Sequence, residues 1–255
     1  MEDYSVYSGG KSFETWLSQT WKRARVDFTS EGCRKWRVLE LGSGKRIGNA
    51  RITGAIDGRV VVCCSVFSQD EMGNLAVRGS EILIAMVNMK NYSPKPLLGR
   101  LNVTHYLPVY KWQEDGTLAV YLSETDEDWS GLDPRIPQRT NWTGHLFSPK
   151  KGGFLEKQTA FHQYLGEGPL RGGFRPWTGD WGEETRGEAC RAVTRKGEIC
   201  VTNPHLGEDF KQVHQIEGVK TIAFSRYGLL ALQSRVIDTK ETTDLLFFPL
   251  TPSSD

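Results

Sequence analysis

The segment 50–67 constrains the fold of this chain more than any other part of the sequence. Two runs rich in β-branched residues, 50–56 and 59–67, flank the dipeptide Asp57-Gly58. Asp-Gly between two such runs is typical of the type I′ turn of a two-residue β-hairpin, because both turn positions require a positive φ. The sequence therefore predicts an antiparallel hairpin here.

Similar β-rich runs recur on both sides of this hairpin. Separated by short turns, they lie at 34–41, 80–88, 97–104, 105–112, 117–122, 189–194, 198–202, 219–225, 228–237 and 245–248. Many short strands at such spacing indicate an antiparallel sandwich or barrel. We therefore predict a mainly β fold, an antiparallel β-sandwich or barrel, as one domain over 1–255 with its β core at 34–122 and 189–248.

The N-terminal region predicts an amphipathic helix over 11–25. Ser12 is a suitable N-cap, and cations gather at the C-terminal end, where the helix dipole favours them. The apolar face comprises Phe13, Trp16, Leu17 and Trp21. We expect this helix to pack on a sheet; the alternative is that it docks on a partner or contacts a membrane surface peripherally.

Residues 123–188 differ from the rest and predict a loop-rich insertion. Repeated prolines interrupt it, with one short helix expected at 155–165. A long loop rich in glycine, arginine and tryptophan follows at 166–182, and such long loops are often functional or disordered. The tail 251–255 is expected to be disordered from its composition.

Composition limits the classes of function. The formal net charge is +1, from 32 basic and 31 acidic residues, so any attraction to polyanions has to be local. The first ten residues lack the pattern of a signal peptide, and no apolar run is long enough for a transmembrane segment. The odd number of five cysteines suggests reduced thiols and an intracellular location, cytoplasmic or nuclear.

One local excess of charge predicts a nucleic-acid surface. Residues 22–51 contain nine basic and three acidic side chains. Arginine pairs with phosphate in a bidentate manner, and aromatic side chains stack on bases. The candidate contacts in this segment are Arg34, Lys35, Trp36, Arg37, Lys45 and Arg46. The alternative is a solvated face of a strand.

The glycine-rich loop supplies a second candidate surface for a nucleic acid or a protein partner. Its cations and flat rings are the residue types that interface hot spots prefer. The candidates are Arg171, Phe174, Arg175, Trp177 and Trp181. The alternative is that this loop folds back and buries its aromatic rings.

Zinc is the only cofactor that the sequence suggests. Cys190, Cys200, His205 and His214 have the ligand types of a zinc site, although their spacing is not that of a common zinc finger. The alternative is two small strand residues and two surface imidazoles. The adjacent Cys63 and Cys64 are expected to point to opposite faces of a strand and to fill the core.

No catalytic motif is complete in the sequence: a P-loop, HExxH, GxSxG and CxxC are all missing. The sequence therefore favours a non-catalytic binding protein that engages single-stranded nucleic acid such as RNA. A protein–protein adaptor is the alternative, and a hydrolase with an unrecognised site is a third hypothesis. A compact, tryptophan-rich chain without motifs is compatible with a viral accessory or movement-type protein.

Overall fold

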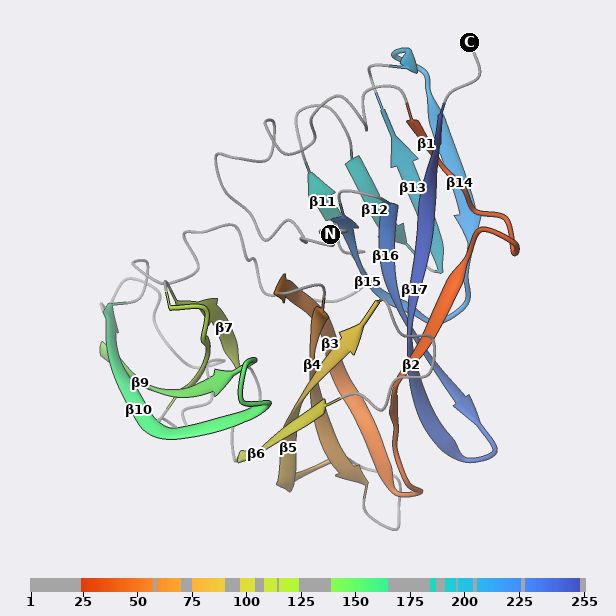
Figure 1. Ribbon diagram of the computed structural model, residues 1–255. Coiled ribbons are helices and arrows are strands. Elements are labelled where there is room, and N and C mark those ends of the chain that lie inside the picture. Colours follow the sequence, from red (N-terminus) through yellow and green to blue (C-terminus); the bar gives the residue numbers. More distant parts are fainter. Residues whose placement is uncertain are drawn as a thin grey trace.

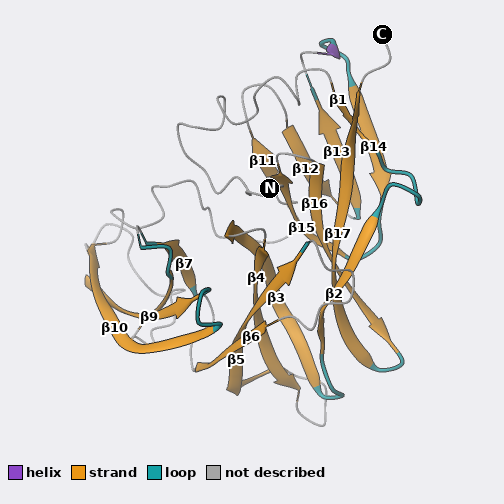
Figure 2. Cartoon of the chain, viewed as in Figure 1, coloured by secondary structure: helices purple, strands orange, loops and turns teal. Residues whose placement is uncertain are grey.

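The protein is built almost entirely of β-strands. A computed structural model describes residues 24–56, 59–69, 75–89, 97–103, 108–113, 115–123, 139–164, 184–186, 191–195, 197–203, 206–225 and 228–252. Within these ranges strands dominate and no α-helix occurs; the one short helical piece, at Leu206, is a 3₁₀ turn (Figure 2). The prediction of a mainly β, antiparallel fold is confirmed.

The described strands form four antiparallel sheets (Figure 1). The first contains β3 (Lys45–Ile56), β4 (Arg59–Gln69), β5 (Leu75–Asn88) and β6 (Leu97–Val103) in order. The second contains β7 (Val109–Trp112), β8 (Leu118–Ser123), β9 (Arg139–Ser148) and β10 (Gly153–Tyr164). The third contains β11 (Glu184–Arg186), β12 (Arg191–Arg195), β13 (Glu198–Thr202) and β14 (Lys211–Gln215).

The fourth sheet joins the two ends of the described chain. Its C-terminal strands are β15 (Val219–Ser225), β16 (Gly228–Ile237) and β17 (Lys240–Pro252), with β15 at the edge. Two strands from the N-terminal side, β1 (Ala24–Val26) and β2 (Arg34–Glu40), pair with successive halves of β17. The sheet is therefore completed by residues that lie about two hundred positions earlier in the sequence.

Three apolar cores lie between the sheets, which pack face to face. One core fills the space between the β3–β6 and β7–β10 sheets and includes Ile84 and Phe147. A second joins the β3–β6 sheet to the fourth sheet, and a third joins the fourth sheet to β13.

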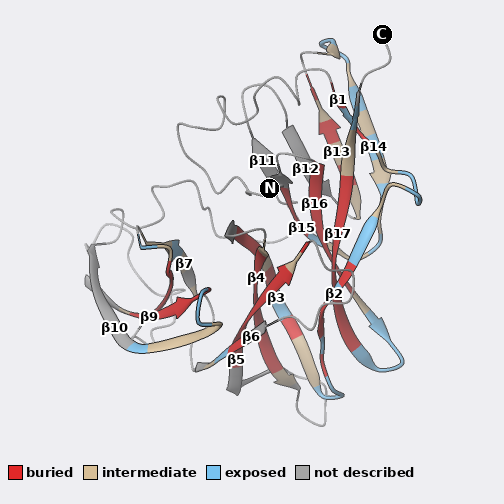
Figure 3. Ribbon diagram, viewed as in Figure 1, coloured by how far each residue is buried: buried red, intermediate tan, exposed pale blue. Residues whose placement is uncertain are grey.

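Two of the sheets are buried on both faces, which explains the continuous apolar runs in the sequence. Successive residues of a strand point to opposite faces. On β4, Val61 and Cys63 belong to one core while Val62 and Cys64 belong to the next. Figure 3 shows the corresponding stretches of β4, β16 and β17 as buried. The prediction that Cys63 and Cys64 fill the core from opposite faces is confirmed.

The hairpin predicted at 50–67 is present, whereas the finer description as a sandwich or barrel is wrong. Ile56 pairs with Arg59, as a two-residue turn requires. The described strands are divided among four sheets, however, and fit neither two sheets of a sandwich nor one closed barrel. Each hairpin fixes local pairing but leaves the division into sheets undetermined.

Three predictions about other segments also need correction. The residues 11–23 of the predicted helix lie outside the described part, but Ala24 and Arg25 belong to strand β1. The insertion 123–188 contains the β9–β10 hairpin, and its expected helix at 155–165 is mostly strand β10. The expected disordered tail begins within β17, because Thr251 pairs with Arg25.

Trp36 on β2 is the largest fully buried side chain among the described residues, at 1% exposure, and packs in the core between the fourth sheet and the β3–β6 sheet. We expect Trp36→Ala to lower the free energy of unfolding by about 3–5 kcal/mol, because truncation leaves a cavity at the strand that completes the sheet. Urea denaturation measures this loss. Val236→Ala, at a site 60% exposed, is the control and should change stability by less than about 0.5 kcal/mol.

Candidate functional site

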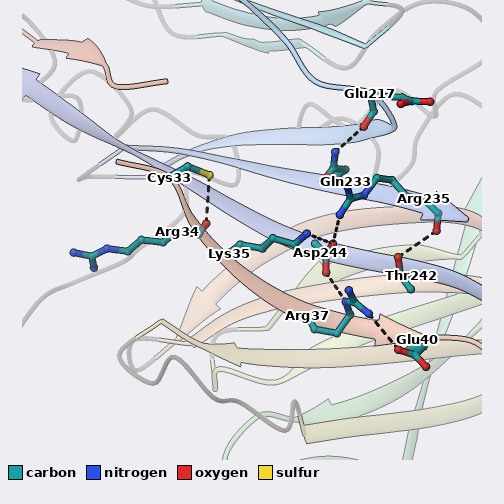
Figure 4. Close-up of polar contacts among 10 residues, drawn as sticks. All are labelled: Cys33, Arg34, Lys35, Arg37, Glu40, Glu217, Gln233, Arg235, Thr242 and Asp244. Carbon is teal, nitrogen blue, oxygen red and sulfur yellow. Dashed lines mark hydrogen bonds and ion pairs between the residues drawn. The ribbon is translucent and has the colours of Figure 1, made fainter. Parts of the chain in front are cut away.

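Asp244 of β17 is a buried carboxylate surrounded by three cations (Figure 4). Lys35 Nζ lies 2.8 Å from Asp244 Oδ2, and Arg37 Nε donates to Asp244 Oδ1 at 2.6 Å. From β16, Arg235 Nη2 donates to Asp244 Oδ2 at 3.3 Å. The Asp244 side chain is 1% exposed, whereas the three cations are between 36% and 44% exposed. The cations therefore face solvent over a buried negative charge.

Strand register brings these residues together. Arg37 pairs with Asp244 across the β2–β17 ladder, and Lys35 pairs with Leu246 two positions further along. Residues two apart share a face of a strand, so Lys35 and Arg37 both lie on the Asp244 face. A register shift between Thr243 and Asp244 brings Arg37 opposite Asp244.

The cations determine the protonation state of Asp244. Burial by itself raises the pKa of this carboxyl, but hydrogen bonds and charges from Lys35 and Arg37 outweigh it. The pKa of Asp244 consequently lies below its ordinary value of 3.8. Asp244 is therefore ionised at neutral pH and is unsuited to act as a general acid there.

The group of charges continues toward the start of β17, at Lys240. Lys240 Nζ lies 3.1 Å from Glu40 Oε1, and Arg37 Nη1 lies 3.2 Å from Glu40 Oε2. We call the four side chains Lys35, Arg37, Arg235 and Lys240 the cationic face. With Asp244 and Glu40 as the acids paired with them, this group has an excess of two positive charges.

The structure uses the predicted basic segment differently from what the sequence suggested. Trp36 is buried in the core, so its role as an exposed base-stacking residue is wrong. The physical reason is the strand period, which turns Trp36 away from Lys35 and Arg37. Lys35 and Arg37 do lie together at the surface, but ion pairs engage both.

The remaining basic residues predicted in this segment occupy other positions. Lys45 of β3 forms an ion pair of 2.5 Å with Glu81 in the β3–β6 sheet. Arg46 donates from Nη1 to the carbonyl of Lys45 at 3.2 Å, and Arg34 is exposed at the start of β2. The described contacts therefore place Lys45 and Arg46 apart from the Asp244 group.

The predicted zinc set is not assembled as a unit. Cys200 pairs with Val213, whereas Ile199 pairs with His214, so Cys200 and His214 lie on opposite faces of the β13–β14 ladder. These two side chains cannot serve one metal ion, and this part of the prediction is wrong. Cys190 and His205 lie outside the described residues. In the described ranges, no group of three or more His, Cys, Asp or Glu is placed to hold a metal ion.

His214 has a packing role instead. Its ring stacks on Phe28 with centroids 4.7 Å apart and meets the edge of Phe248 at 5.8 Å. Nearby, the Gln212 amide accepts from the Val26 backbone nitrogen and donates to the Val26 carbonyl, both at 2.9 Å. Burial lowers the pKa of His214 below its ordinary value of 6.5. These contacts join β14 to β1 and β17.

The buried cysteines are poor nucleophiles. Burial raises the pKa of the Cys64 thiol to about 12 and that of Cys63 further still. Both therefore remain protonated at neutral pH, and a thiol is far less reactive than a thiolate.

The second predicted surface lies outside the described residues. This holds for all five candidates of the glycine-rich loop, Arg171, Phe174, Arg175, Trp177 and Trp181. Within the described ranges, no helix has the length and apolar character required to cross a membrane.

Sequence reasoning missed Arg235, Lys240 and Asp244, which complete the site. Asp244 was the detectable signal, because it is a lone acid next to the apolar run 245–248. A charged residue in a buried strand needs a paired charge. The sequence could have indicated that Asp244 requires a positively charged partner, but it could not identify Lys35 and Arg37 as those partners.

Comparisons with known proteins do not assign the chain to a family. No protein-family model and no curated protein matches the sequence.

We expect Asp244→Asn to lower the free energy of unfolding at pH 7 by about 1–3 kcal/mol, because the three cations lose their buried partner. Since the folded-state pKa is lowered, the contribution of Asp244 is present above about pH 3.8 and is lost as pH falls below that value. Denaturant titrations at several pH values should show the wild type approaching the variant in acid. Glu40→Gln, an exposed acid on the same face, is the control and should have a small effect.

His214→Phe should reduce the pH dependence of stability in mildly acidic solution. Because the folded-state pKa of His214 is below 6.5, the unfolded chain binds the proton more readily, and stability falls as pH drops below that value. Phenylalanine preserves the ring contacts and removes the titration. His145, whose pKa is also lowered by burial, remains in both proteins, so the difference between them isolates His214. Identical pH profiles would contradict the assigned role.

Proposed function

We propose that the chain is a non-catalytic intracellular protein that binds single-stranded nucleic acid through the cationic face. The observation that carries the proposal is the local excess of positive charge in this otherwise nearly neutral chain. Arginine and lysine at the surface attract phosphates and release their counterions. The buried Asp244 holds Lys35, Arg37 and Arg235 in place, which limits the ordering cost of binding.

An unpaired hydrogen-bond donor in the cationic face supports the proposal that the ligand is an anion. The Arg235 Nε is buried and has no hydrogen-bond partner in the described part of the chain. An unpaired buried donor is costly, and a small turn of the guanidinium toward a phosphate oxygen would satisfy it. Arginine presents its donors as a fork that matches phosphate geometry.

The glycine-rich loop remains part of this proposal as a second contact, as the sequence predicts. Its arginine and aromatic residues would add cations and stacking surfaces to a bound strand. The free state of Cys33, Cys63, Cys64 and Cys200 supports a reducing location, cytoplasmic or nuclear.

The proposal is tested by the salt dependence of binding to a fluorescent single-stranded oligonucleotide. For single strands, each neutralised phosphate contributes about 0.7 to the slope of log K against log salt. Lys240→Ala should therefore reduce the slope by roughly this amount, and adding Arg235→Ala should reduce it further. Lys240 is 54% exposed, so the single variant should fold normally.

Lys211→Ala is the matched control, because Lys211 is an exposed lysine on β14, in the third sheet and not in the fourth. Its slope should equal that of the wild type. Slopes that are the same in all variants would overturn the proposed site. Capture of a cellular protein that survives nuclease treatment, without oligonucleotide binding, would support the adaptor alternative instead.

A further inference from the structure

The hairpin that joins β16 to β17 presents aliphatic side chains to solvent. Val236 is 60% exposed and Ile237 is 40% exposed, and the turn residues Asp238 and Thr239 are exposed as well. Figure 3 shows this tip as an exposed extension of a buried hairpin. Exposed aliphatic side chains beside cations are a candidate contact surface.

The tip is a tight two-residue turn. Ile237 pairs with Lys240, and the two turn residues have φ values of 48° for Asp238 and 67° for Thr239. Positive φ at both positions is the type I′ geometry, which glycine and asparagine normally occupy. A β-branched threonine there is strained, so the tip keeps its narrow shape at some energetic cost.

The register assigns the two aliphatic side chains to different faces. Gln233, Arg235 and Ile237 alternate onto one face of β16, and their partners on β17 are Asp244, Thr242 and Lys240. Ile237 therefore lies on the same side of the sheet as the cationic face. It is opposite Lys240 and two residues from Arg235 along β16. Val236 lies on the opposite face of the same hairpin.

We propose that Ile237 contacts an unpaired base of the bound strand while the adjacent phosphates bind the cationic face. This inference rests on the proposed function. Arg235 and Ile237 are two residues apart, about 6.6 Å along the strand, which is comparable with one or two nucleotides. A nucleotide offers both an anion and an apolar ring face at that spacing. Aliphatic side chains such as isoleucine pack against base faces in other complexes.

Contact with a base face requires a single strand as the ligand, because a duplex hides its base faces in the stack. A membrane surface fits the tip less well. Val236 and Ile237 point to opposite sides, so inserting both would carry the charged Asp238 of the adjacent turn into the apolar layer, which is costly. A base needs contact with Ile237 alone.

The test compares Ile237→Ser with the matched control Val236→Ser, using a twelve-nucleotide single-stranded RNA and an abasic strand of the same length. Ile237→Ser should weaken binding to the normal strand about fivefold to tenfold, from the aliphatic area it removes. Val236→Ser should leave the affinity within about twofold. On the abasic strand, Ile237→Ser should have no effect. The wild type should also bind the single strand more tightly than the corresponding duplex.

The outcomes separate this inference from the proposed function. If Ile237→Ser binds as the wild type does while Lys240→Ala still lowers the salt slope, the base contact is wrong and the cationic face stands. Equal losses in both serine variants would also overturn the base contact. If no oligonucleotide binds, both proposals fail. Binding to phosphatidylserine vesicles that Ile237→Ser abolishes would then identify a membrane as the ligand.

Discussion

Burial of both faces of the two central sheets is the constraint on which the rest of the structure depends. β4, β16 and β17 each contribute alternate side chains to two different cores. A register slip of one residue would exchange the contents of these cores, so the pairing of these strands is strongly specified. The polar group around Asp244 lies where the fourth sheet leaves its apolar packing and reaches solvent.

The ion pairs of Asp244 join strands of the fourth sheet and, under the proposed function, also hold the cations that bind the ligand. Lys35 and Arg37 attach β2 to β17, and the same side chains present charge outward. Glu241, the second residue of β17, accepts a hydrogen bond from the Ile47 backbone nitrogen at 2.8 Å, and its carbonyl accepts one from the Leu41 backbone nitrogen. Such a framework holds the cations of the fourth sheet in a fixed arrangement.

Local patterns in the sequence predicted local structure, and the failures lie in long-range pairing. The Asp57-Gly58 turn fixed its hairpin because the pairing partners are neighbours. The apolar runs at 60–64 and 245–248 were identified as strands, but burial on two sides could not be separated from a sandwich core by period alone. Trp36 was expected to contact bases because its aromatic ring lies within a basic segment of the sequence. Only its pairing with Leu245 shows that it faces inward. The same long-range pairing hid the assembly of Lys35, Arg37 and Asp244.

The pairing of β2 with β17 also affects how the protein is made. During synthesis, β2 leaves the ribosome long before its partner; Lys240 and Glu40 are separated by 200 residues. Throughout that interval the Trp36 side chain lacks its final surroundings, and the edge of β2 is free to pair with other strands. Translation proceeds at about 5–20 residues per second, so this exposure lasts on the order of tens of seconds. The nascent chain therefore has a defined period in which a chaperone would be most useful, and it ends when β17 emerges.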